Sequence, residues 1–461
     1  MTSLARPARR LLSIALAAVV AAGSILPAAA SAQQGVSLIR DTEIEEILLG
    51  DSKPLFAAAG MDPNSVEILL VGGKDLQAFA GPGVMGVYTG LILQSENPNQ
   101  LRGVIAHEIG HLQGGHSFRR GEMQRAGLKP MLLTMGLGVL AALAGAPDAG
   151  AILAGNASYF GTLGALGYSR EQESRADQAG ATLLEKTGQS GRGLVEFFDN
   201  FRYQEVFDES RRFAYFRSHP LSSDRIEALR GRVEKLSHYD AVDSPDDVAK
   251  HEIMKAKLDG FINPQLSLIR YKETDASYPA RYARAIAYYQ MKEPDRAIRL
   301  VDALLTEQPN NPYLWELKGQ ILFEFARTAE AEGPQRKSVE LKPDAPLLRT
   351  NLGQTLINMP DPKKIEEGIA ELKRSLVEDP ENSTAWRLLG QAYDTQKEPG
   401  KARLATAEYY FSLGALQEAR VFAMRARENL SKDTIDWRRA TDIVLASRPS
   451  DEDLKRIARE G

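Results

Sequence analysis

The chain has 461 residues, of which 26% are charged and 43% hydrophobic, and its formal net charge is -4 at pH 7. This length allows two or three domains of ordinary globular composition, and the charge balance argues against a nucleic-acid-binding protein, which would need a clustered basic face. Cysteine is absent, which excludes disulfides, a thiolate nucleophile and lipid attachment to an N-terminal thiol.

Residues 1–32 have the pattern of a secretory signal peptide. A start with three arginines is followed by an uncharged apolar run, and Ala30-Ser31-Ala32 offers a small-residue cleavage site. A membrane anchor is the weaker interpretation, because the apolar core is short and Pro27 precedes the cleavage pattern. We expect export by the general secretory route and cleavage after Ala32.

One helix and two stretches of strand are predicted before the first histidine motif. Residues 41–49 are expected to form the helix, because their apolar side chains fall on one side. Residues 66–71 indicate a buried strand, and residues 77–93 indicate further strand. Within the second stretch, residues 84–88 are predicted as an exposed edge with which an extended substrate peptide could pair, and an ordinary internal strand is the alternative.

The segment 97–116 has clear signals for both ends of a helix. Asn97 followed by Pro98 predicts an N-cap and a first turn, where the missing N–H of proline costs nothing. Apolar residues then recur at steps of three and four, which indicates one buried stripe. Gly114-Gly115 predicts the end of the helix.

This helix contains an HExxH motif, the strongest chemical signal in the sequence. His107 and His111 stand one turn apart, so both imidazoles can bind one Zn²⁺, and Glu108 lies beside the metal to accept a proton from its bound water. A chance pair of histidines on a polar face is the alternative, but the apolar stripe argues against a solvated face. The motif therefore predicts a zinc-dependent hydrolase.

A catalytic zinc site needs a third protein ligand and one open position. His116 is the nearest candidate, but the metzincin pattern HExxHxxGxxH would need its last histidine at Ser117. Glu173 and Asp177 lie one helical turn apart further along, so Glu173 could bind the metal while Asp177 accepts the second ring N–H of a ligand histidine. A charged, solvent-facing helix explains the same pair, and the residues alone leave these possibilities open.

The region between these motifs is unusually apolar. Residues 131–146 and 151–166 form two pieces of 16 residues each, and both are shorter than the roughly 20 residues of a membrane-spanning helix. Three interpretations are open: core helices under the active site, a hydrophobic flap over the cleft, or a surface hairpin that makes peripheral contact with a membrane or an unfolded client.

The sequences HEIGH, YSREQESRAD and Ser218-His219-Pro220, in this order, resemble the gluzincin peptidases of the HtpX and BepA type over about residues 36–235. The resemblance implies a zincin-type α+β metalloprotease domain with a small sheet. One departure is visible, because the family usually shows Asn-Ala-Phe in the strand before the zinc helix and this chain has Gln77-Ala78-Phe79.

The resemblance also implies roles for individual residues. It makes His107, His111 and Glu173 the ligands of one Zn²⁺ per chain. It makes Glu108 the general base, with Asp177 and Arg225 behind the ligands.

His219 is expected on a loop, because Pro220 disfavours a helical conformation for the residue before it. By resemblance it is a catalytic residue that donates to the developing oxyanion, a role that Arg225 could support, or it binds the open zinc position and closes the site until a substrate displaces it. A plain surface-loop histidine is the alternative. His238 and His251 have no partners in spacing and are expected at the surface.

The C-terminal part contains an internal repeat. Gly319, Gly353 and Gly390 recur at intervals of 34 and 37 residues, and prolines ten residues before each glycine keep the same spacing. With its tryptophans and tyrosine the period is similar to tetratricopeptide repeats, and residues 280–308 and 402–429 fit as an earlier and a later helical pair. We expect an all-α solenoid whose concave side binds proteins.

The expected chain is mainly α. It consists of a signal peptide (1–32), a zinc metallopeptidase domain (33–240), a linker with a lead-in helix (241–270) and a tetratricopeptide-repeat domain (271–461). The resemblance implies a periplasmic zinc metalloendopeptidase that hydrolyses misfolded or stalled outer-membrane and envelope proteins. Its expected partners are unfolded or partly assembled outer-membrane proteins and the barrel-assembly machinery. The alternative is a latched protease that acts mainly as a chaperone or scaffold in outer-membrane protein assembly.

Overall fold

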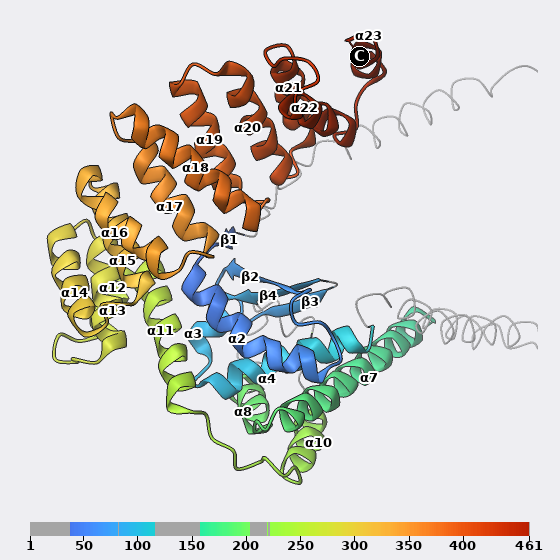
Figure 1. Cartoon of the computed structure of the whole chain (residues 1–461). Coiled ribbons are helices and arrows are strands. Elements are labelled where there is room, and N and C mark those ends of the chain that lie inside the picture. Colours follow the sequence, from blue (N-terminus) through green and yellow to red (C-terminus); the bar gives the residue numbers. More distant parts are fainter. Residues whose placement is uncertain (1–36, 82, 116–156, 203–218, 220–221, 461) are drawn as a thin grey trace, which may run out of the picture. The chain divides into compact units, whose positions relative to one another are not determined.

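The computed structural model describes residues 37–81, 83–115, 157–202, 219 and 222–460 (Figure 1). The described residues from Leu38 onward belong to one compact unit. The predicted signal peptide, His116 and the apolar residues 131–156 lie outside the described residues. In the part that is described, no helix combines the length and the apolar character needed to cross a bilayer.

Four short strands form one mixed sheet in the order β1-β2-β4-β3. They are β1 (Ser37–Ile39), β2 (Glu67–Gly72), β3 (Ala78–Gly81) and β4 (Val84–Tyr88). Strand β4 runs parallel to β2 and antiparallel to β3, so it has a hydrogen-bonded neighbour on each side. The prediction that residues 84–88 form an exposed edge is therefore wrong, and β3 is an edge strand instead.

The strand predicted over residues 77–93 ends at Tyr88, and the short helix α3 (Thr89–Gln94) follows. The Thr89 hydroxyl donates to the carbonyl of Gly73 at 2.9 Å and accepts its N–H at 3.1 Å, which fastens the chain where it turns. Leu91 and Ile92 are fully buried. A short apolar run fits a buried strand and a buried helix equally well, which explains the error.

Helix α2 (Thr42–Ala58) begins where the sequence indicates, with Asp41 accepting the N–H of Ile44 at 3.0 Å as its N-cap. It extends beyond the predicted residues 41–49. Its buried side chains join those of the sheet and of the next helices in one hydrophobic core. That core is the support on which the histidine-bearing helix lies.

Helix α4 (Pro98–Gln113) carries the HExxH motif and has both predicted ends. Asn97 accepts the N–H of Gln100 at 2.9 Å, and Gly115 takes a positive φ of 64° just after the helix. The helices α7 (Ala157–Lys186) and α8 (Arg192–Arg202) pack against it, and α10 (Ser223–Val233) packs against α7 and α8. Figure 1 shows α4 between α2 and the long α7.

The C-terminal part is all helical, as the repeat predicts. After α11 (Pro245–Ile262) and α12 (Pro264–Arg270), antiparallel pairs follow one another along the chain. The helices are α13 (Tyr278–Gln290), α14 (Pro294–Glu307), α15 (Pro312–Glu324), α16 (Thr328–Leu341), α17 (Pro346–Ile357), α18 (Pro362–Glu378), α19 (Ser383–Thr395), α20 (Pro399–Ser412), α21 (Leu416–Arg427), α22 (Ile435–Ala446) and α23 (Asp451–Glu460).

A recurring hydrogen bond accompanies the prolines of the repeat. The Nε1 of Trp315 donates to the carbonyl of Pro309, and the Nε1 of Trp386 donates to that of Pro380, each at 2.8 Å. In the repeat between them Arg349 donates from Nε to Pro343, also at 2.8 Å. A long side chain with an N–H donor thus fixes the turn before each of these helices.

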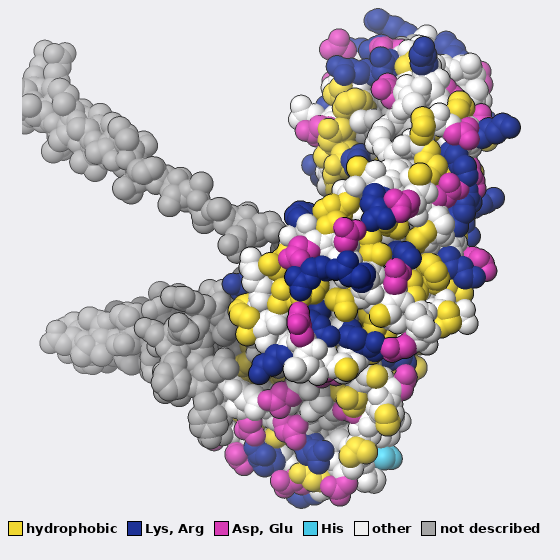
Figure 2. Space-filling model, turned by 90° about the vertical axis from the view of Figure 1, so that its left-hand side faces the viewer, with side chains coloured by type: hydrophobic (Ala, Val, Ile, Leu, Met, Phe, Trp, Pro, Cys, Tyr) yellow, Lys and Arg dark blue, Asp and Glu magenta, His cyan; other side chains and the backbone are white. Residues whose placement is uncertain are grey.

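The surface of the repeats is mixed in character. Figure 2 shows hydrophobic side chains interspersed with Lys and Arg and with Asp and Glu over the upper part of this face, so neither sign of charge covers it alone.

Candidate metal centre

Helices α4 and α7 approach closely enough for their backbones to touch. A Cβ on Gly110 would lie 2.6 Å from the carbonyl oxygen of Ala176, and one on Gly180 would lie 3.1 Å from the nitrogen of His107. Only glycine fits both places without a shift. The close packing brings Glu173 and Asp177 of α7 beside the two histidines of α4.

Three side chains from these helices converge on one point. The Nε2 atoms of His107 and His111 lie 3.1 Å apart. The Glu173 carboxylate lies 3.5 Å from Nε2 of His107 and 3.3 Å from Nε2 of His111. All three residues are buried, with at most 9% of each exposed.

His219 joins the same cluster from the segment before α10. Its Nδ1 lies 3.4 Å from Nε2 of His107 and 3.1 Å from Oε2 of Glu173. With His111, these residues place one donor atom each within 4.8 Å of one another.

The chemistry of these donors fits a zinc ion, for which imidazole nitrogen and carboxylate oxygen are preferred ligands. Nδ1 of His107 lies 2.9 Å from Oδ1 of Asp177, and Nε2 of the same ring faces the cluster. Burial lowers the pKa of His107, but hydrogen bonds to Asp177 and Glu173 outweigh it and raise the pKa to about 9. A proton and a metal ion therefore compete for the same position.

Two carboxylates, that of Glu173 in the cluster and that of Asp177 next to it, are held ionised. Burial raises the pKa of Glu173, but hydrogen bonds from His107, His111 and His219 outweigh burial and place the pKa well below its ordinary value. The pKa of Asp177 is lowered in the same way, mainly by its hydrogen bond with Arg225. Both side chains can thus serve as anionic partners at neutral pH.

Arg225 of α10 connects these two carboxylates. Its Nη2 donates to Oδ1 of Asp177 at 2.8 Å, its Nε donates to the other oxygen, and its Nη1 lies 2.9 Å from Oε2 of Glu173. The guanidinium also lies 5.0 Å from the centroid of the Phe198 ring. These contacts hold the Arg225 guanidinium against the carboxylates of Asp177 and Glu173.

Glu108 lies beside the cluster and is 3% exposed. Among the described residues, its Oε1 has no hydrogen-bond partner, and Nε2 of His219 lies 3.7 Å from it. Burial raises the pKa of Glu108. A carboxylate with a free acceptor atom and a raised pKa is suited to accepting a proton.

Two further described histidines, His238 and His251, do not belong to the cluster. His238 is exposed, as predicted, and its Nδ1 lies 3.1 Å from Oε1 of Glu185. The prediction that His251 lies at the surface is wrong, because it is 1% exposed and its Nε2 lies 3.2 Å from the carbonyl oxygen of Ser95. Packing of α11 against α3 buries it, which no local pattern reveals.

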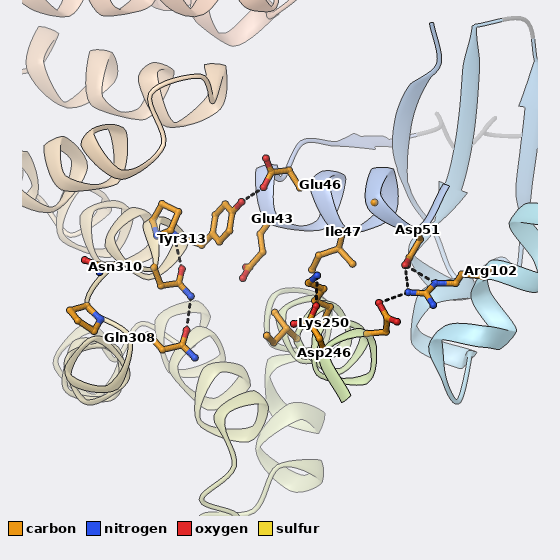
Figure 3. Close-up of a pocket in the computed structure, with 16 residues that line it drawn as sticks. Glu43, Glu46, Ile47, Asp51, Arg102, Asp246, Lys250, Gln308, Asn310 and Tyr313 are labelled. Carbon is orange, nitrogen blue, oxygen red and sulfur yellow. Dashed lines mark hydrogen bonds and ion pairs between the residues drawn. The ribbon is translucent and has the colours of Figure 1, made fainter. Parts of the chain in front are cut away.

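One charged residue of α4 was missed by sequence reasoning. Arg102 reaches Asp51 of α2 and Asp247 of α11, each at 2.7 Å from Nη2, and so fastens the histidine helix to both neighbours. Figure 3 shows this network at the edge of a pocket of about 820 Å³, whose lining includes none of the four cluster residues. The available signal was an arginine directly after Leu101, beside the apolar stripe.

With this geometry in hand, comparisons with known proteins identify the class. Residues 39–233 match the family model of Peptidase family M48, and residues 282–346 and 364–411 match that of the Tetratricopeptide repeat. Residues 39–233 therefore form a Peptidase family M48 domain, and the chain is a metalloprotease with tetratricopeptide repeats. The predicted peptidase resemblance and fold class are confirmed.

The chain is similar to several named relatives. It is 27% identical over 397 residues to the beta-barrel assembly-enhancing protease of Yersinia pestis, covering 83% of this chain and 79% of the relative. It is 26% identical over 397 residues to the protein of that name from Escherichia coli (strain K12), covering 83% and 78%. It is 33% identical over 171 residues to the Metalloprotease YcaL of the same strain, covering 35% of this chain and 59% of YcaL.

Proposed function

We propose that this chain is a periplasmic zinc metalloendopeptidase that hydrolyses peptide bonds of misfolded or stalled outer-membrane and envelope proteins. The observation that carries the proposal is the convergence of His107, His111 and Glu173, with the buried Glu108 carboxylate beside them. The similarity to proteins named beta-barrel assembly-enhancing protease supports this class of client.

In this mechanism His107, His111 and Glu173 hold the metal, and Asp177 keeps the His107 proton on Nδ1. Zinc bound there supplies a Lewis acid that polarises a carbonyl and acidifies water. Glu108 accepts a proton from the attacking water and returns it to the leaving amine. Its burial supports this role, since a raised pKa lets the carboxyl hold a proton for part of the cycle.

The substrate is proposed to bind along β3, which replaces the edge predicted at residues 84–88. Strand β3 is an edge of the sheet, and it contacts α4, the helix with the HExxH motif. An extended peptide that adds to this edge would hold its main chain beside the cluster by backbone hydrogen bonds.

A second candidate function rests on His219. Its ring lies between the proposed ligands and Glu108, 3.1 Å from Glu173 and 3.7 Å from Glu108. A histidine there occupies the space that water and a scissile carbonyl need. This favours a latched protease that acts mainly as a chaperone or scaffold and cleaves when a client displaces His219.

The division of the chain is part of the proposal. Export through the signal peptide 1–32 would place the mature protein in the periplasm, with the peptidase domain at 33–240 and the linker at 241–270. The repeats from 271 to 461 would hold clients or partners such as the barrel-assembly machinery. The apolar residues 131–166 are a proposed contact for a client or a membrane surface.

The test compares Glu108→Gln with the natural chain and with Glu185→Gln, a matched control in the ion pair with His238. We expect Glu108→Gln to keep one zinc by elemental analysis while its cleavage of unfolded casein and of an unfolded outer-membrane barrel is lost. Glu185→Gln should retain both. Undiminished cleavage in Glu108→Gln would overturn the mechanism.

Two further variants separate the open alternatives. His219→Ala gains activity if His219 is a latch and loses activity if it stabilises the oxyanion. Glu173→Gln should lose zinc while His116→Ala keeps it; the opposite result would establish the metzincin-type ligand set.

A further inference from the structure

Helix α8 places one aromatic side chain against two members of the metal centre. Phe198 is fully buried and belongs to the hydrophobic core of the peptidase domain. Its ring meets that of His107 edge to face, with centroids 5.8 Å apart and planes at 90°. The guanidinium carbon of Arg225 lies over the same ring, 5.0 Å from its centroid. Phe198 therefore packs against a proposed metal ligand and against the arginine behind it.

The position of Phe198 is set by a close approach of α4 and α8. A Cβ on Gly103 of α4 would lie 2.8 Å from Cα of Leu194 of α8, so the two main chains nearly touch at this point. His107 stands four residues after Gly103, and Phe198 stands four residues after Leu194. The contact between the two rings thus lies about one helical turn beyond the backbone contact on each helix.

The contacts of Phe198 close a ring of four side chains. Nδ1 of His107 lies 2.9 Å from Asp177, which accepts a hydrogen bond from Nη2 of Arg225 at 2.8 Å. The guanidinium nitrogens face the carboxylates of Asp177 and Glu173. Phe198 lies against the guanidinium carbon and leads back to His107. Each of the four side chains in this ring is therefore held by two others.

An aromatic ring supplies two interactions here that an aliphatic side chain of similar burial lacks. The negative face of the ring attracts the guanidinium of Arg225. The edge-to-face contact favours one orientation of the His107 imidazole, because aromatic pairs prefer this arrangement to a stacked sandwich. Leucine in place of Phe198 would fill much of the space and provide neither interaction.

We propose that Phe198 is a positioning residue of the metal centre, whose ring holds the His107 imidazole and the Arg225 guanidinium in the orientations that zinc binding requires. Phe198 itself binds no metal and moves no proton. The inference rests on the proposed function, because it takes His107 as a zinc ligand. It adds a residue of α8 to a ligand set that comes from α4 and α7.

The experiment measures the zinc affinity of the full chain by competition with a chromophoric chelator. We expect Phe198→Leu to weaken zinc binding about tenfold, the lower end of the range for groups behind a metal ligand. With Co²⁺ in place of zinc, the visible absorption bands report ligand geometry and should shift or lose intensity. Phe56→Leu is the control, because Phe56 of α2 is equally buried in the same core, and it should change neither quantity.

A second replacement separates the charge distribution of the ring from its shape. Pentafluorophenylalanine, introduced in place of Phe198 by codon suppression, nearly keeps the shape of the ring and reverses the sign of its face. We expect zinc binding to weaken about threefold or more, because the guanidinium then meets a positive face. The same replacement of Phe56 should leave the affinity unchanged. This variant also decides the question if Phe198→Leu does not fold.

Zinc affinity equal to that of the natural chain after either replacement of Phe198 overturns the proposal. An equal loss of affinity after the same replacement of Phe56 also overturns it, because a general loosening of the core would then explain the effect. A natural chain that binds no zinc would refute the proposed function and this inference with it. A natural chain whose zinc is held as tightly without the Phe198 ring would refute this inference alone.

Discussion

Nδ1 of His107 lies 2.9 Å from Oδ1 of Asp177, a residue one helical turn beyond Glu173 on the facing helix. We propose that this contact keeps the ring proton on Nδ1 and so leaves Nε2 free to bind the metal.

From this contact we expect Asp177→Asn to weaken zinc binding about 10–100-fold, the usual effect of losing a carboxylate behind a ligand histidine. Competition with a chromophoric chelator measures the affinity. Asp199→Asn is the control, because Asp199 is an arginine-paired carboxylate on α8 outside the cluster. Equal zinc affinity in Asp177→Asn and the natural chain would refute the role given to Asp177.

Arg225→Lys tests whether the bridge between Asp177 and Glu173 stabilises the domain. One ammonium cannot reproduce the forked contacts to both carboxylates, and a buried acceptor left without its donor costs about 1–3 kcal/mol. We expect a loss of this size in the free energy of unfolding measured with urea. Arg230→Lys, in a half-exposed pair with Asp199, should cost under about 1 kcal/mol. Similar losses of unfolding free energy in Arg225→Lys and Arg230→Lys would contradict a stabilising role for the bridge.

His251 should make stability depend on pH. Burial lowers its pKa to about 4, whereas the unfolded chain titrates near 6.5. Between these values the unfolded chain binds a proton that the folded chain does not, so acidification favours unfolding. We expect His251→Gln to remove about 2 kcal/mol of the stability lost between pH 7 and pH 5. Urea unfolding at pH 7 and at pH 5 measures this loss of stability. His238→Gln, a change at the surface, is the control and should leave the loss unchanged.

Two glycines in the repeats should respond oppositely to alanine. A Cβ on Gly353 would lie 2.7 Å from Cγ of Leu372, whereas one on Gly333 meets nothing within 4 Å. We expect Gly353→Ala to lower the free energy of unfolding by about 1–3 kcal/mol through overpacking. Gly333→Ala, inside α16, should raise it by about 0.5–1 kcal/mol through helix propensity. Thermal unfolding of both variants checks the signs, and a stabilising Gly353→Ala would contradict the packing described here.

The features that the sequence predicts well are those encoded within one turn or one repeat. Asn97 and Gly114 bound the histidine helix, and the i, i+4 spacing of His107 and His111 directs both rings to one side. The proline period identifies the helical pairs. In each case the signal and the structure it produces lie within a few residues of each other.

The wrong or missing predictions concern contacts between residues that lie far apart in the sequence. His251 is buried against Ser95, 156 residues away, and Arg102 binds Asp51, 51 residues away. Strand β4 is not an edge strand, contrary to the prediction, because β2 and β3 both pair with it. These outcomes depend on which distant elements meet, and a local pattern carries no information about that.

The backbone contact of α4 and α7 through Gly110 and Gly180 has a consequence for engineering. This close approach sets the distance between the main chains that carry the donor side chains, so it limits how far the donor atoms can move apart. A change of metal preference should therefore be sought by exchanging the proposed ligands His107, His111 or Glu173 for other ligand types. Larger residues at the two glycines would separate the helices and dismantle the coordination geometry altogether.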